Sequence, residues 1–243
     1  MSLTKQEKRQ VVLISGGASG IGRCMAEAFL GEGSAVHICD ASAENIATFL
    51  ESNPAATATL ADVGNADDVA RVFSDLKSDY DNLDVLVNNA GIQYTEVIEA
   101  FPTERWDALI AINLSAPFHA TQAVLPGMKR RGWGRIVNIA SNAGLGGSVR
   151  KSAYVAAKHG VVGLTKVTGL ETAQSGVTCN AICPGWVKTP LVDVQIEDRA
   201  KMDGTSIEQA TYDLLIDQQP SGRFTTFEQL AGAALFLCSS AAD

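Results

Sequence analysis

Val11-Val-Leu-Ile-Ser-Gly16-Gly-Ala-Ser-Gly20-Ile-Gly22 decides the fold, because it joins a short apolar run to a glycine-rich turn. Residues 23–30 follow with helical periodicity, so the order is strand, turn, helix. Glycines let the backbone of such a turn approach a pyrophosphate, and the start of the helix offers free N–H groups and a favourable dipole. The stretch therefore predicts a dinucleotide-binding unit.

Apolar runs alternate with helix-forming segments along the rest of the chain. The predicted strands are 35–40, 57–63, 83–91, 135–141 and a segment that begins at residue 176. This alternation predicts an α/β protein with a Rossmann-like, doubly wound parallel sheet and helices on both faces. The 243 residues are 46% hydrophobic and show no linker-like stretch, so we expect residues 1–243 to form a single domain.

Bulk properties exclude several classes of function. A formal net charge of -8 argues against nucleic acid as a partner, because a phosphate-binding surface needs a basic excess. The charged first ten residues lack the apolar stretch of a signal peptide, so we expect a soluble, cytoplasmic protein that binds no membrane. The five cysteines and three histidines are scattered without metal-ligand spacing, so we predict no catalytic metal.

Asp40 ends the second predicted strand, about twenty residues beyond the glycine turn. A carboxylate at this place accepts hydrogen bonds from the adenosine ribose. It would repel a 2′-phosphate, and the following Ala41 offers no arginine to neutralise that phosphate. Arg23 is the one cation nearby in the sequence. The pattern therefore favours NAD over NADP.

Ser141, Tyr154 and Lys158 are the candidate catalytic residues. Tyr154 and Lys158 are four apart in a helical segment, so they share one face, and the ammonium is expected to lower the pKa of the phenol. Ser141 ends a predicted strand, where its hydroxyl faces the ligand crevice of an α/β sheet. The Tyr-x-x-x-Lys pattern alone is also typical of a surface pair on an ordinary helix.

A long helix is predicted from Thr103, and it contains Pro117. Proline has no backbone N–H to bond the carbonyl of Asn113, so we expect a kink and a carbonyl that is free to hold water.

The Gly-x-x-x-Gly-x-Gly turn, Asn88-Asn89-Ala90-Gly91 and the Ser141, Tyr154, Lys158 arrangement together resemble the short-chain dehydrogenase/reductase family over nearly the whole chain. The resemblance implies that Asn113 holds a relay water and joins these three residues as the catalytic set. It also implies a homotetramer that packs through the helices of Asn113 and Tyr154. The implied NAD-binding residues are Gly16, Ser19, Gly20, Ile21, Gly22, Asp40, Asp62, Val63, Asn89, Ala90, Gly91, Tyr154, Lys158, Pro184, Gly185, Val187 and Thr189. Asp62 could equally cap the next helix.

Within that family, residues 86–118 and 153–191 resemble the D-3-hydroxybutyrate dehydrogenases, enzymes of ketone-body metabolism. That resemblance implies NAD-dependent interconversion of a 3-hydroxy and a 3-oxo acid. The implied substrate-binding residues are Gln93, Ser141, Lys151, Tyr154, Trp186 and Gln195. A cation and two amides suit a carboxylate.

Three alternatives remain open. One is an NADP-dependent reductase of 3-oxoacyl thioesters, against which Asp40 and Lys151 argue. Another is a different short-chain alcohol or sugar dehydrogenase. The last is a non-catalytic dinucleotide sensor, which would not need the whole catalytic set.

Two departures from the resembled family concern Ala143 and the end of the chain. Relatives carry histidine where this sequence has Ala143, as a further donor to the substrate carboxylate. Relatives also continue through one more edge strand, whereas this sequence ends at Asp243.

Residues 187–219 are expected to form a mobile lid over the substrate.

Overall fold

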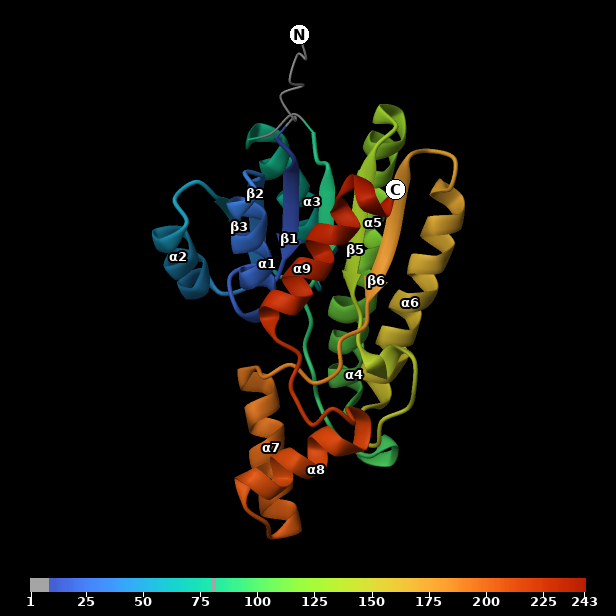
Figure 1. The fold of residues 1–243 in the computed structure, drawn as a ribbon. Helices are drawn as coiled ribbons and strands as arrows, with labels where there is room; N and C mark the ends of the chain where they lie inside the picture. Colours follow the sequence, from blue (N-terminus) through green and yellow to red (C-terminus); the bar gives the residue numbers. More distant parts are fainter. Residues whose placement is uncertain (1–8, 80–81) are drawn as a thin grey trace.

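The computed structural model describes residues 9–79 and 82–243, and it contains one parallel sheet (Figure 1). Among the described residues the sheet has six strands in the order β3-β2-β1-β4-β5-β6. The strands are β1 (Val11–Ser15), β2 (Ala35–Asp40), β3 (Thr57–Leu60), β4 (Val85–Asn88), β5 (Gly134–Ile139) and β6 (Val177–Ile182). The order reverses between β1 and β4, which opens a crevice at the carboxyl ends of these strands. The predicted fold class is confirmed.

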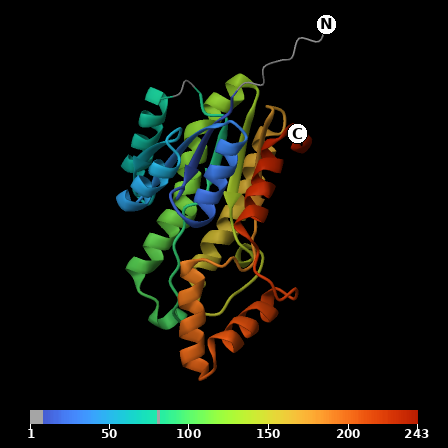
Figure 2. The same ribbon diagram turned by 60° about the vertical axis from the view of Figure 1, so that its left-hand side comes forward.

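Helices cover both faces of the sheet, because each presents an apolar stripe to it (Figures 1 and 2). On one face, α1 (Gly20–Gly31), α2 (Ala43–Ser52) and α9 (Phe227–Cys238) bury Met25, Phe49 and Leu230 against the strands. On the other face, α3 (Ala66–Asp79), α5 (Ala116–Arg131) and α6 (Ser152–Thr172) pack, with Leu76 and Met128 among the buried side chains.

A short π-helical turn, η2 (Ala111–Ser115), joins α4 (Thr103–Ile110) to α5. The irregularity was predicted at Pro117, but it precedes that residue: the N–H of Ala116 bonds to the carbonyl of Ala111, and Pro117 lies in the first turn of α5. Proline has no N–H to continue the ladder of helical hydrogen bonds, so the bonding pattern changes at this point of the continuous helix Thr103–Arg131. The stretch 103–131 is long and apolar enough to cross a membrane, a test that core helices of soluble proteins also pass.

The third strand is shorter than predicted. β3 ends at Leu60, so Asp62 and Val63 lie in the following loop. The side chain of Asn65 accepts the N–H of Asp67 and caps α3, while Asp62 accepts the N–H of Gly64. Asp62 therefore does not cap the helix. It lies in the loop between β3 and α3, at the edge of the crevice.

Two helices project beyond the carboxyl ends of the strands, α7 (Pro190–Asp203) and α8 (Ile207–Gln218) (Figures 1 and 2). They have a small apolar core of their own, against which Trp186 and Phe224 pack. Its buried members are Val192, Ile196, Ala200, Ala210 and Leu214. The remaining short helical turns are η1 (Ile98–Ala100), η3 (Asn142–Gly144) and η4 (Ser240–Ala242).

Candidate active site

A cavity of about 570 Å³ opens at the carboxyl ends of the strands, between the sheet and α7. All the predicted site residues line it except Gly22 and Asn113. Ala143, where the resembled dehydrogenases carry histidine, also lines it. Residues that the sequence did not single out line it as well, among them Cys39, Ile92, Ile112, Ile139, Asn142, Ser148 and Val192. Most of these side chains are apolar, and they come from strand ends, loops, the helical turns η2 and η3 and the start of α7, so no single sequence periodicity marks them.

The glycine turn after β1 forms the floor of one end of the cavity. Gly16 and Gly20 have φ angles of 62° and 53°, which favour glycine. Gly22 supports the turn from behind, because a Cβ on it would lie 2.1 Å from the carbonyl oxygen of Gly16. The side chain of Ser19, the N-cap of α1, makes no capping hydrogen bond. The start of α1 therefore suits the pyrophosphate of a dinucleotide.

Asp40 lines the same end of the cavity, and its carboxylate is held in place by backbone donors. It accepts the N–H of Ala18 and the N–H of Ser42, each at 3.1 Å. Arg23 pairs instead with Glu27 at 2.8 Å. The cation that the sequence placed near Asp40 is thus engaged with another carboxylate.

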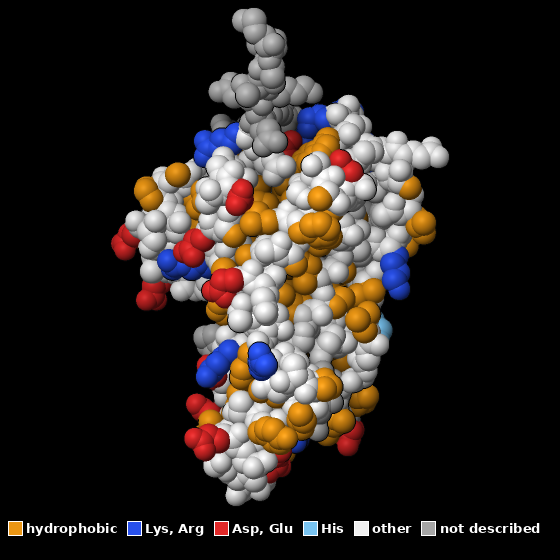
Figure 3. Space-filling model, in the orientation of Figure 1, with side chains coloured by type: hydrophobic (Ala, Val, Ile, Leu, Met, Phe, Trp, Pro, Cys, Tyr) orange, Lys and Arg blue, Asp and Glu red, His pale blue; other side chains and the backbone are white. Residues whose placement is uncertain are grey.

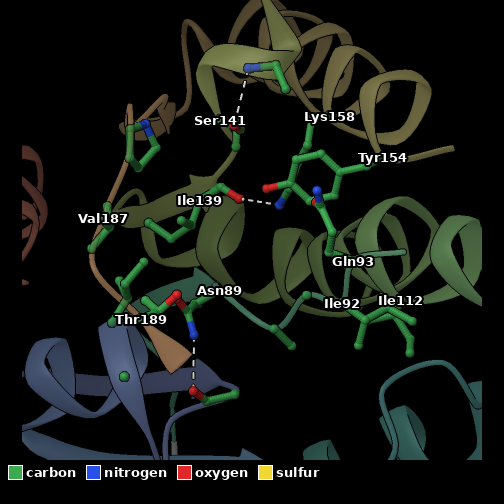
Figure 4. Close-up of a pocket in the computed structure, with 18 of the residues that line it drawn as sticks. Asn89, Ile92, Gln93, Ile112, Ile139, Ser141, Tyr154, Lys158, Val187 and Thr189 are labelled. Carbon is green, nitrogen blue, oxygen red and sulfur yellow. Dashed lines mark hydrogen bonds between the residues drawn. The ribbon is translucent and has the colours of Figure 1, made fainter. Parts of the chain in front are cut away.

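Asparagine side chains join the strands below the cavity. Asn88 on β4 donates to Asn138 on β5 at 2.8 Å. Asn89, labelled in Figure 4, donates to the carbonyl oxygens of Ser15 and Gly16 at 3.0 Å each. The Asn88-Asn89 pair thus ties neighbouring strands together through side-chain hydrogen bonds. These bonds fix the ends of β1, β4 and β5 relative to one another.

Tyr154 and Lys158 extend from α6 toward the end of β5 (Figure 4). The Lys158 ammonium is buried, donates to the carbonyl of Ile139 at 2.7 Å and lies 5.6 Å from the centre of the Tyr154 ring. Burial lowers the pKa of Lys158 to about 8. Burial also raises the pKa of Tyr154, and a hydrogen bond with Ser141 opposes that rise only in part. The net direction differs from the expected lowering, because desolvation is the largest cause of the shift and the Lys158 ammonium is not among its causes.

Ser141 directly precedes η3, and its hydroxyl is oriented by its neighbours. It donates to Oδ1 of Asn142 at 3.1 Å and accepts the N–H of Ala143 at 3.2 Å. A serine held in this way, beside a tyrosine hydroxyl, provides a site for a substrate oxygen.

Asn113 does not line the cavity: it is buried in η2, and both polar atoms of its amide bond to one residue. It accepts the N–H of Ile92 and donates to the Ile92 carbonyl, both at 2.9 Å. A Cβ on Gly91 would lie 2.9 Å from Oδ1 of Asn113. The side chain of Asn113 therefore fixes the segment after β4, and its role in a water relay stays a prediction.

Lys151 stands at the other end of the cavity, at the N-cap of α6. Its ammonium donates to Oε1 of Gln195 at 3.0 Å and lies 4.6 Å from the centre of the Trp186 ring. Burial lowers its pKa to about 8, and among the described residues it forms no ion pair. Gln93 lines the same cavity. The residues predicted to hold the substrate carboxylate and its apolar carbons are thus brought to one cavity.

The turn before Lys151 was not anticipated from the sequence. Arg150 has a φ angle of 64° and is held by Glu96, which pairs with its guanidinium at 3.1 Å and donates its N–H to the Arg150 carbonyl at 2.9 Å. A non-glycine residue with this φ angle is strained and needs such support. The two contacts between Glu96 and Arg150 therefore hold the turn that precedes α6.

Comparisons with known proteins agree with this geometry. Residues 10–200 match the family model described as short chain dehydrogenase. The D-beta-hydroxybutyrate dehydrogenase of Cupriavidus necator is 49% identical over 238 residues, which cover 96% of this chain and 92% of the relative. The enzyme of the same name from Rhizobium meliloti is 50% identical over 177 residues, covering 73% of this chain and 69% of the relative.

Among solved structures, a variant actinorhodin polyketide ketoreductase with NADPH superposes with a TM-score of 0.91. It is 36% identical, and the match covers 96% of this chain and 92% of that one. The family model spans well over half of the chain and includes the glycine turn, Ser141, Tyr154 and Lys158. The protein therefore belongs to the short-chain dehydrogenase/reductase family, oxidoreductases that use a nicotinamide dinucleotide.

Proposed function

We propose that this protein interconverts a 3-hydroxy acid, D-3-hydroxybutyrate or a larger analogue, and the 3-oxo acid with NAD as cofactor. The observation that carries the proposal is the half-buried ammonium of Lys151, which faces the cavity without an ion-pair partner among the described residues. A desolvated cation of this kind is stabilised by an incoming anion. Both hydroxybutyrate dehydrogenases named above support the same substrate class.

The acid–base chemistry is assigned to Tyr154. Its hydroxyl accepts the proton of the substrate alcohol during oxidation and returns it during reduction. Ser141 holds the substrate oxygen, and Lys158 holds a positive charge on the Tyr154 side of the cavity. The bound nicotinamide supplies the hydride acceptor, and the glycine turn, Asn89 and Thr189 fit that cofactor because all line one continuous cavity.

The substrate carboxylate is assigned to Lys151, Gln195 and Gln93, with the Trp186 ring against the apolar carbons. The Trp186 face already contacts the ammonium, so the cation stays at the edge of an apolar wall. A charge-assisted hydrogen bond is worth about 1.5–3 kcal/mol, so this group is sufficient to distinguish a free acid from a neutral thioester.

NAD is proposed over NADP because the two oxygens of Asp40 are presented at the adenosine end of the cavity. The preference is not uniform among similar proteins, since the superposed ketoreductase has NADPH. The ketoreductase alternative predicts the opposite cofactor and a thioester substrate, so an assay separates the two functions.

We also propose that the protein assembles as a homotetramer and is located in the cytoplasm. Apolar side chains gather over the region of α9 and β6 (Figure 3). Phe118 on α5, Val167 and Leu170 on α6 and Phe236 on α9 are all exposed. Such surfaces favour association through the helices. Light scattering that reports a stable monomer at micromolar concentration would contradict the assembly.

The decisive assay compares D-3-hydroxybutyrate with its methyl ester. We expect NADH formation with the acid, at least about tenfold lower kcat/KM with the ester, and weaker use of NADP. An ester that works as well as the acid would refute the role of Lys151. A preference for NADPH and 3-oxoacyl thioesters would establish the ketoreductase alternative.

A further inference from the structure

The α7–α8 unit is attached to the rest of the protein by two chain segments, 183–189 and 219–226. Trp186 lies in the first segment, and its ring packs against the apolar core of α7 and α8. The same ring faces the Lys151 ammonium. The position of one indole therefore depends on both the projecting helices and the cavity.

Gln219, the C-cap of α8, connects the two segments through its side chain. Its Oε1 accepts the backbone N–H of Trp186 at 2.7 Å, across 33 positions of sequence. Its amide nitrogen donates to the backbone carbonyl of Arg223. One side chain thus bonds the segment that leaves the sheet and the segment that returns to it.

The neighbouring backbone reinforces this link. The N–H of Thr225 donates to the Trp186 carbonyl at 2.8 Å, and Val187 forms a parallel bridge with Thr225. Both backbone polar groups of Trp186 therefore have partners in the segment 219–226. The ring is left as the part of the residue that faces the cavity.

The backbone beside Trp186 is shaped to receive the glutamine. A Cβ on Gly185 would lie 2.4 Å from Oε1 of Gln219, so a larger residue would displace the glutamine side chain from its present position. A cap that served α8 alone would bond to groups of its own helix. The close approach to Gly185 and the long-range bond to Trp186 indicate a function in the loop rather than in the helix end.

We propose that Gln219, which does not itself line the cavity, is a positioning residue for substrate recognition. It fixes the backbone of Trp186, and through the indole it holds the Lys151 ammonium where the substrate anion binds. The substrate part of this inference rests on the proposed function, whereas the effect on Trp186 does not depend on which substrate is used.

The test uses the whole 243-residue chain with three substitutions. Gln219→Met keeps the length of the side chain and removes both hydrogen bonds. Gln219→Glu keeps an acceptor for the Trp186 N–H but has no donor for Arg223. Gln209→Met is the matched control, because Gln209 is an exposed glutamine of α8 whose side-chain amide bonds to Asp213 on the same helix.

Two readouts are needed. In a Trp106→Phe, Trp133→Phe background, where Trp186 is the remaining tryptophan, acrylamide quenching reports how firmly the indole is held. We expect Gln219→Met to raise the quenching constant about twofold or more and Gln209→Met to leave it unchanged. In kinetics, we expect Gln219→Met to raise the KM of the hydroxy acid about tenfold with kcat lowered less than threefold, and Gln219→Glu to recover much of that loss.

Unchanged quenching in Gln219→Met would overturn the inference, whatever the substrate proves to be. The inference would also be overturned if Gln219→Met lowered kcat and thermal stability and raised the KM values of the hydroxy acid and of NAD to a similar extent. Such a uniform effect would show a merely structural role. If D-3-hydroxybutyrate is not oxidised at all, the proposed function fails, and the quenching comparison still decides the role of Gln219.

Discussion

The Lys151 ammonium lies 4.6 Å from the centre of the Trp186 ring, although the two residues come from different parts of the fold. Lys151 stands at the start of α6 and Trp186 follows β6. The ring shields the ammonium from water on one side, and burial lowers its pKa to about 8. The cation is therefore close to losing its proton at mildly alkaline pH, and substrate binding should report this.

The KM of the hydroxy acid should rise with pH. Only protonated Lys151 attracts the carboxylate, and the protonated fraction falls about tenfold per pH unit above the pKa. With a pKa of about 8, we expect the KM at pH 9 to be about tenfold higher than at pH 7. Steady-state kinetics across this range at saturating NAD provide the measurement.

Lys151→Arg isolates the group responsible, since a guanidinium keeps its charge throughout that range. Its KM should stay flat with pH even if the absolute value is higher. Lys166→Arg, at an exposed site on the same helix, should retain the wild-type rise. A rise of the same size in Lys151→Arg would show that another group titrates.

Tyr154→Phe should lower kcat by at least about 10²-fold while the dissociation constant of NADH changes little. The substitution removes the hydroxyl that exchanges a proton with the substrate and keeps the ring. Fluorescence titration with NADH and turnover assays measure the two quantities. Tyr212→Phe, at an exposed position on α8, is the control. A variant that keeps more than about a tenth of wild-type turnover would exclude Tyr154 as the base.

Lys158→Met should abolish turnover and stabilise the fold at neutral pH. The folded-state pKa of Lys158 is about 8, below its ordinary value of 10.5. The cost of burying the charge is therefore full below pH 8 and disappears as the pH rises toward 10.5. Removing the charge should raise the free energy of unfolding by about 2 kcal/mol at pH 7, after allowance for the lost bond to Ile139.

Urea denaturation at pH 7 and at pH 10 measures this difference. The gap between Lys158→Met and wild type should narrow at the higher pH, because the wild-type lysine is then neutral in the folded protein. A gap that widens with pH would contradict the direction of the pKa shift.

Asp40→Ala should weaken NAD binding about tenfold and narrow the preference for NAD over NADP. The carboxylate supplies both the ribose acceptor and the repulsion of a 2′-phosphate. Its removal also leaves the N–H groups of Ala18 and Ser42 without their acceptor. The ratio of kcat/KM values for the two cofactors is the relevant measurement, and a wild-type protein that prefers NADP would contradict the assignment.

The sequence was sufficient to predict the order of strands and helices, because the alternation of apolar runs and helical periodicity is a local property. It also placed Ser141, Tyr154 and Lys158 at one site, since strand ends of a parallel sheet lie on one edge. The end of β3 and the π turn before Pro117 were misplaced by a few residues. Hydrogen bonds within the loop after β3, and those between Asn113 and Ile92, lie at these boundaries, and neither set has a local sequence signature.

Long-range contacts between irregular segments were not predictable. Gln219 is an ordinary polar residue after a helix, and nothing near it in sequence indicates a bond to Trp186. The turn at Arg150 is similar, because the residue that bonds to both its backbone and its side chain, Glu96, comes from another segment. The predicted lowering of the Tyr154 pKa was also wrong, since the direction of that shift depends on how deeply the folded chain buries the phenol.

Ala143→His should improve the use of small 3-hydroxy acids relative to larger ones. Ala143 is buried, lines the cavity and follows Ser141 by two residues, at the place where the resembled dehydrogenases carry histidine. A hydrogen bond to a charged group is worth about 1.5–3 kcal/mol, so an added donor should tighten the binding of D-3-hydroxybutyrate about tenfold or more. Each methylene of a larger substrate recovers up to about 0.8 kcal/mol by burial, and the imidazole would occupy that space. The measurement compares kcat/KM values for hydroxybutyrate and 3-hydroxyvalerate in both proteins. If histidine leaves the ratio unchanged, then Lys151, Gln93 and Gln195 already hold the carboxylate and the alanine does not set the size of the substrate.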